Sequence, residues 1–131
     1  MHTEIKITQK ELLDNLTENN NLRDIQEYIK KVIEIRGFDN QPVQDAMLLL
    51  LEEVGELAKA IRKGYRPIDK NKKQNYDTVE SEIADVLIVL TSISNLLSID
   101  MFQALKDKET ENINRCWEKN KFEADIDKKE E

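Results

Sequence analysis

The sequence predicts an all-α protein of the four-helix-bundle type. Glycine and proline are scarce, with three and two residues among 131, and aromatic residues make up only 5%. This composition favours long helices over a β-sandwich or barrel. Apolar residues recur at helical spacing in four segments, and a hydrophobic content of 39% is enough for one modest core. We therefore expect one helical domain.

The four core helices are expected at residues 22–36, 43–63, 76–98 and 100–120. The first has an apolar stripe and is followed by Gly37, which is well placed to end it. The turn at residues 39–42 leads into the second helix, and Gly64 is placed to end that one. Asp100 is a good N-cap for the fourth helix.

The remaining segments flank or connect this domain, which we place at residues 22–121. Residues 1–21 form an extra N-terminal leader, in which Thr8-x-x-Glu11 resembles a capping box and predicts a short helix. Residues 65–75 form a basic connection, either a solvated loop or a lid that meets polyphosphate. Residues 122–131 are an acidic tail that we expect to be flexible.

Composition also excludes several functions. The formal net charge of −7 argues against binding to nucleic acid or to a membrane surface. One cysteine, Cys116, excludes an internal disulfide and a thiolate zinc cluster, and we expect it to be a core residue. One histidine, His2, leaves no imidazole for a catalytic triad or for the Glu-x-x-His pairs of a di-iron bundle. With no apolar signal segment and no membrane-length apolar run, we expect a cytoplasmic protein.

Two segments, Leu48–Ile61 and Ser81–Leu90, place carboxylates beside apolar residues. On a helical wheel Glu53 borders the apolar arc of the first segment, Glu56 lies one turn further, and Glu82 and Asp85 lie within the arc of the second. An ionised carboxylate removed from water is costly unless something compensates its charge, and no basic residue has the right spacing on either carboxylate face. A hard cation held between two helices, Mg²⁺ or Mn²⁺, explains the pattern. The alternative is a set of edge carboxylates that reach solvent.

The order Glu52-Glu53-x-x-Glu56 followed by Glu82-x-x-Asp85, within EEVGELAKAI and EIADVLIVL, resembles the MazG-like all-α nucleotide pyrophosphohydrolases over residues 22–121. The resemblance implies an enzyme that cleaves a nucleoside triphosphate to a monophosphate and pyrophosphate, in nucleotide-pool control or house-cleaning. It implies Mg²⁺, with Mn²⁺ as a possible substitute, on Glu53, Glu56, Glu82 and Asp85. Glu52 and Glu53 would be catalytic, with Glu52 binding an additional ion or orienting water.

The expected fourth helix carries Lys108, Asn112 and Arg115 along one stripe. Such groups suit phosphate oxygens, although Lys and Arg late in a helix also suit solvent and the helix dipole. In MazG-like proteins the corresponding Lys, Asn and Arg face the nucleotide phosphates, so the resemblance implies that role here. Trp117 points off the stripe and is expected to pack in the core.

The second and third helices are apolar on nearly every side, which indicates burial on more than one face. We therefore expect self-association, and the resemblance implies a homodimer or homotetramer with a nucleoside triphosphate as substrate. Three alternatives stay open: a dUTPase-like or dCTPase-like activity, a phosphoribosyl-ATP pyrophosphatase activity, and a helical interaction module without catalysis.

Overall fold

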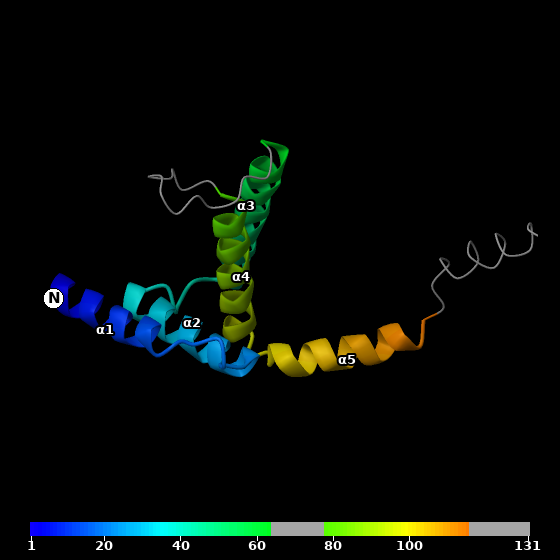
Figure 1. Ribbon diagram of the computed structural model, residues 1–131, viewed down its shortest axis with the longest axis horizontal. Coiled ribbons are helices and arrows are strands. Elements are labelled where there is room, and N and C mark those ends of the chain that lie inside the picture. Colours follow the sequence, from blue (N-terminus) through cyan, green and yellow to red (C-terminus); the bar gives the residue numbers. More distant parts are fainter. Residues whose placement is uncertain (64–77, 116–131) are drawn as a thin grey trace, which may run out of the picture.

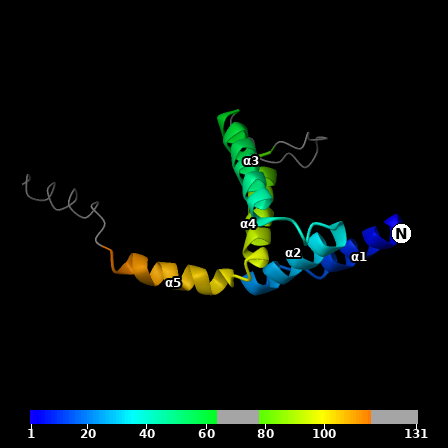
Figure 2. The same ribbon diagram turned by 180° about the vertical axis from the view of Figure 1, so that it is seen from behind.

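The computed structural model describes residues 1–63 and 78–115. Within these residues the protein is entirely helical and has no strand, which confirms the all-α prediction. The five helices are α1 (His2–Asp14), α2 (Leu22–Arg36), α3 (Val43–Arg62), α4 (Val79–Leu96) and α5 (Met101–Ile113). In Figures 1 and 2, α3 and α4 lie side by side and antiparallel, the α1–α2 pair crosses one end of them, and α5 leads away.

The end of α2 agrees with the sequence prediction. Gly37 adopts the left-handed conformation at φ 80°, and the Phe38 N–H donates to the Ile33 carbonyl. These features form a Schellman turn, which satisfies the last carbonyls of the helix. At the start, the Asn21 side chain accepts from the Asp24 N–H while the Asp24 carboxylate accepts from the Asn21 N–H.

Three predicted helix boundaries are wrong. The helix expected from residue 76, α4, begins at Val79, because Thr78 is extended and its side chain accepts from the Ser81 N–H as an N-cap. The capping box proposed for Thr8 and Glu11 does not start a helix, because α1 already begins at His2 and the Thr8 hydroxyl donates to the Glu4 carbonyl inside it. The fourth core helix, α5, begins after the expected N-cap Asp100 but ends at Ile113 rather than near residue 120. The expected features at Gly64, 65–75, 76–77, Cys116, Trp117, 116–121 and 122–131 lie outside the described residues.

Among the helices of the described ranges, α3 and α4 pack against each other most extensively. The buried residues of α3 are both alanines, Ala46 and Ala60, and short side chains let two helices approach closely. Val79 and Val89 are buried on α4, while α2 packs against the same helix. Few large apolar side chains are buried in this single copy.

The four expected core helices do not close into a bundle within one chain. α5 bends away from α4 by 98° and makes its main contacts with α2. The outer faces of α3 and α4 expose large apolar side chains, including Leu48, Leu51, Ile83 and Leu87. No single helix among the described residues has both the length and the hydropathy to cross a membrane. α4 and α5 meet these two criteria only when they are taken together, as this bent pair.

Candidate metal centre

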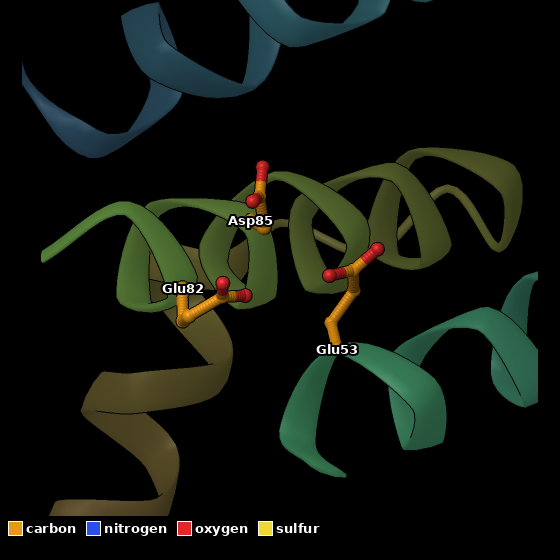
Figure 3. A group of neighbouring side chains, drawn as sticks. All are labelled: Glu53, Glu82 and Asp85. Carbon is orange, nitrogen blue, oxygen red and sulfur yellow. The ribbon is translucent and has the colours of Figure 1, made fainter. Parts of the chain in front are cut away.

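Three carboxylates meet where α3 packs against α4. Glu53 comes from α3, and Glu82 and Asp85 come from α4. One oxygen of each residue lies within 4.8 Å of those of the other two. Figure 3 shows the carboxylates of Glu53 and Glu82 directed toward each other from the two helices, with Asp85 beside them.

The local sequence explains how these side chains come together. Residues three apart on a helix share one face, so Glu82 and Asp85 project from the same side of α4. The antiparallel packing of α3 then brings Glu53 opposite them. Glu82 is buried, with 6% of its surface exposed, and Glu53 and Asp85 are partly buried. This burial agrees with the helical wheels, which put Glu53 at the border of one apolar arc and Glu82 and Asp85 within the other.

The cluster is electrostatically strained without a cation. Burial raises the pKa of Glu53, and the negative charges of Asp85, Glu82, Glu52 and Glu56 raise it further. The site therefore favours a positive charge, either a proton on Glu53 or a bound ion.

The donor set fits a hard divalent ion. All three donors are carboxylate oxygens, which Mg²⁺, Mn²⁺ and Ca²⁺ prefer over softer ligands. Two oxygens bound to one Mg²⁺ at its usual distance are at most about 4.2 Å apart. The oxygens here lie within 4.8 Å of one another, and because adjacent ligands of an octahedral ion are about 3.0 Å apart, the side chains would have to turn toward one another to bind one ion. The cluster could therefore hold a metal ion, and its chemistry does not select one ion alone.

The family model for the MazG nucleotide pyrophosphohydrolase domain matches residues 41–117, which is more than half of the chain. The protein belongs to the MazG family. A similar solved structure, iMazG from Vibrio DAT 722, aligns with a TM-score of 0.57 and 27% identity over 71% of this chain and 98% of that chain.

A curated relative is an uncharacterised protein, YpjD of Bacillus subtilis strain 168. It is 38% identical over 58 residues, which are 44% of this chain and 52% of that protein. The chain thus spans about half the length of this relative.

Two acids of the MazG signature lie outside the cluster. Glu56 is half exposed, and its Oε2 accepts from the Lys59 Nζ at 3.1 Å. The sequence prediction that no basic residue could pair on this face is therefore wrong for Glu56, because Lys59 lies one turn away. Glu52 is exposed on α3, so its charge acts on the cluster from outside.

The predicted phosphate-binding residues of this MazG chain do not reach the cluster within one copy. Lys108 Nζ pairs with Glu111 at 2.7 Å, and Asn112 Nδ2 donates to Glu109 Oε1. Both belong to α5, which leads away from α3 and α4 in both views (Figures 1 and 2). Arg115 lies beyond the end of α5, so the predicted three-residue helical stripe is wrong for its last member.

A cavity that sequence reasoning missed lies close to the acidic cluster. Its volume is about 430 Å³, and it is bounded by the end of α2, the start of α3 and the second half of α4. Leu49 and Val89 line it, each one helical turn from an acid of the cluster. Two basic residues, Lys30 and Arg36, and two acidic residues, Glu34 and Asp39, also line it, and Arg36 Nε donates to Gln9 Oε1 of α1. Three separate segments form this cavity, so no local pattern could predict it.

Proposed function

We propose that this MazG protein is a metal-dependent pyrophosphohydrolase that cleaves ribo- or deoxyribonucleoside triphosphates to monophosphates and pyrophosphate, in nucleotide-pool control or house-cleaning. The observation that carries the proposal is the cluster of Glu53, Glu82 and Asp85 between α3 and α4. A cavity of about 430 Å³ beside it is within the usual size range of small-molecule sites.

Mg²⁺ is the proposed ion, with Mn²⁺ as a possible substitute. Glu53, Glu82 and Asp85 would hold it, and Glu56 would join them by leaving Lys59. When bound, the ion neutralises charge on the polyphosphate and lowers the pKa of a bound water.

The protein's own groups then have defined roles. The nucleoside lies in the cavity, whose wall includes apolar side chains such as Leu49 and Val89 and polar groups such as Ser92. A water oxygen attacks the α-phosphorus, the bond from that phosphorus to the bridging oxygen breaks, and pyrophosphate leaves. Glu52, exposed beside the cluster, orients the water and takes its proton.

We propose further that the functional unit is a homodimer or homotetramer. The exposed apolar side chains of α3 and α4 would be covered by a second copy, as stable homodimer interfaces require. Because α5 leads away from its own cluster, its phosphate-binding residues, Lys108, Asn112 and the adjacent Arg115, would serve the cluster of that second copy.

The reaction is tested by product analysis. The protein is incubated with each common NTP and dNTP and with dUTP, in Mg²⁺, Mn²⁺ or EDTA, and the products are separated by chromatography. Metal-dependent formation of a monophosphate and pyrophosphate is expected. A diphosphate with orthophosphate would refute the proposed bond, and no turnover in either metal would refute hydrolysis of the nucleotides tested. The preferred nucleotide would separate general from dUTP-specific or dCTP-specific activity.

The shared site is tested by mixing variants. Glu53→Gln lacks an acid of the cluster and Lys108→Ala lacks the cation of α5, so each variant alone is expected to be impaired. Subunit exchange should restore activity, because one mixed site has both groups intact. A mixture of Glu53→Gln with Asp85→Asn is the control and should stay inactive, since both changes affect the same cluster. Failure of the first mixture to recover activity would refute a site shared between copies.

A further inference from the structure

Helix α5 is held mainly at its first turn. None of its residues is buried, and its main packing contacts among the described helices are with α2. Beyond Met101 nearly every side chain of the helix is exposed. Figures 1 and 2 show it extending from the point where α2 begins and α4 ends. The direction of the whole helix therefore depends on the contacts at this junction.

One buried amide joins the three elements that meet there. Gln26 of α2 is 9% exposed, and its Nε2 donates to the Ile99 carbonyl at 2.9 Å and to Asn95 Oδ1 at 3.2 Å. Its Oε1 accepts from the Met101 N–H at 3.0 Å, the first N–H of α5. Asn95 of α4 returns a hydrogen bond from Nδ2 to the Gln26 carbonyl. The amide thus contacts the last turn of α4, the connecting residues and the start of α5.

Other contacts at the junction are weaker or local. Ser98 has φ 55° and forms a Schellman turn that ends α4. Arg23 pairs with Asp100 at 2.7 Å and lies over the Phe102 ring, but the Arg23 and Asp100 side chains are largely exposed. Exposed ion pairs contribute little, whereas a buried and fully paired amide is costly to disrupt. Gln26 is therefore the dominant link.

We propose that Gln26 is a positioning residue that fixes the direction of α5 relative to α4 and so places Lys108 and Asn112 for the substrate phosphates. The fixed angle follows from the junction itself, while the effect on phosphates rests on the proposed function. Loss of the amide would leave the Met101 N–H and the Ile99 carbonyl without this partner and would let α5 take several directions.

The angle is tested by pulsed electron paramagnetic resonance on the full chain. Spin labels are attached at Gln44→Cys on α3 and Lys106→Cys on α5, both exposed positions, with Cys116→Ser to remove the native thiol. Dilution with unlabelled protein isolates distances within one copy. Gln26→Met, which keeps the length of the side chain but not its hydrogen bonds, should broaden or shift the distance distribution. Gln103→Met is the matched control, because the Gln103 side chain donates to Asp107 within α5 and the substitution leaves the Gln103 N–H, which donates to Asp100, in place.

The outcomes separate the two parts of the proposal. An unchanged distribution in Gln26→Met would overturn it, and if that variant does not fold, Gln26→Leu gives the same test, because it also removes the donated and accepted hydrogen bonds of the amide without adding a charge. In the active enzyme, Gln26→Met should raise KM about tenfold, as the loss of one charge-assisted phosphate contact would, with kcat nearly unchanged. A fall in kcat at constant KM would contradict the positioning role. If the parent protein hydrolyses no nucleotide, the proposed function fails while the distance measurement still decides the role of Gln26 in the fold.

Discussion

Replacing Glu53 with glutamine should stabilise the protein when no metal is present. Two unit charges 4.8 Å apart repel by about 0.9 kcal/mol at the dielectric constant of water, and by more where burial reduces screening. Glu53 faces two such charges, those of Glu82 and Asp85, so Glu53→Gln should add about 2 kcal/mol to the free energy of unfolding. For a domain of this size that gain raises Tm by about 6 °C.

Thermal melts followed by circular dichroism, in EDTA and across a Mg²⁺ titration, measure this effect. The parent should gain stability with Mg²⁺, by about 2.7 kcal/mol at a free concentration 100 times Kd, and Glu53→Gln should gain much less. The order of the two proteins should therefore reverse. Glu11→Gln is the control, because it removes one exposed negative charge far from the cluster. A variant that melts below the parent in EDTA would refute the repulsion argument.

The gain should also depend on pH, with a defined sign. The folded-state pKa of Glu53 is raised, mainly by burial and then by its acidic neighbours, so the native state binds this proton more tightly than the unfolded chain. The parent therefore loses stability as pH rises from the ordinary pKa of glutamate through the raised value. The difference between Glu53→Gln and the parent should be small at about pH 4 and complete at about pH 7.5. An equal difference at both pH values would show that ionisation of Glu53 is not the cause.

Three further changes test other parts of the structure. Asp85→Asn should abolish nucleotide hydrolysis while circular dichroism reports unchanged helix content; turnover at the parent's rate would exclude Asp85 from the site. Ser98→Gly should raise the free energy of unfolding in urea by about 0.5–1 kcal/mol, because glycine adopts positive φ without steric cost; a decrease would mean that the serine side chain itself holds the turn. The Gln103 N–H, and then Arg23, hold the pKa of Asp100 below its ordinary value, so its stabilising effect is lost as pH falls through the lowered pKa. Asp100→Asn, which keeps a capping side chain, should flatten the acid limb of a plot of urea midpoint against pH, and an unchanged limb would contradict this assignment.

The helices that the sequence predicted well carry strong local signals. α2 has the expected bounds because its apolar stripe and Gly37 act within the same few residues. The three acids of the cluster could be predicted from the sequence for a related reason, because their spacing within each helix and the resemblance to MazG proteins point to the same residues. The approach of Glu53 to Glu82 and Asp85 depends on how α3 packs against α4. The sequence pattern suggested this packing but did not determine its geometry.

The errors arise where one side chain has two local uses. Thr8 could cap a helix or donate to a carbonyl four residues back inside one, and it does the second. α5 ends early although its charge pattern continues. There the side chains of Thr110 and Asn114 donate to backbone carbonyls of the last turns, and asparagine has a low helix propensity. The direction of α5 depends on Gln26, which is distant in sequence, so no local pattern could indicate it.

The Schellman turn at Gly37 constrains the protein in two respects. It ends α2, and its flanking residues Ile33 and Phe38 also form part of the cavity wall. A residue with a side chain at position 37 would be strained at φ 80°, and relief of that strain would move Phe38. Tolerance to mutation at this position is therefore set by the shape of the cavity as well as by helix termination, and a library of variants at position 37 should lose ligand affinity and thermal stability together.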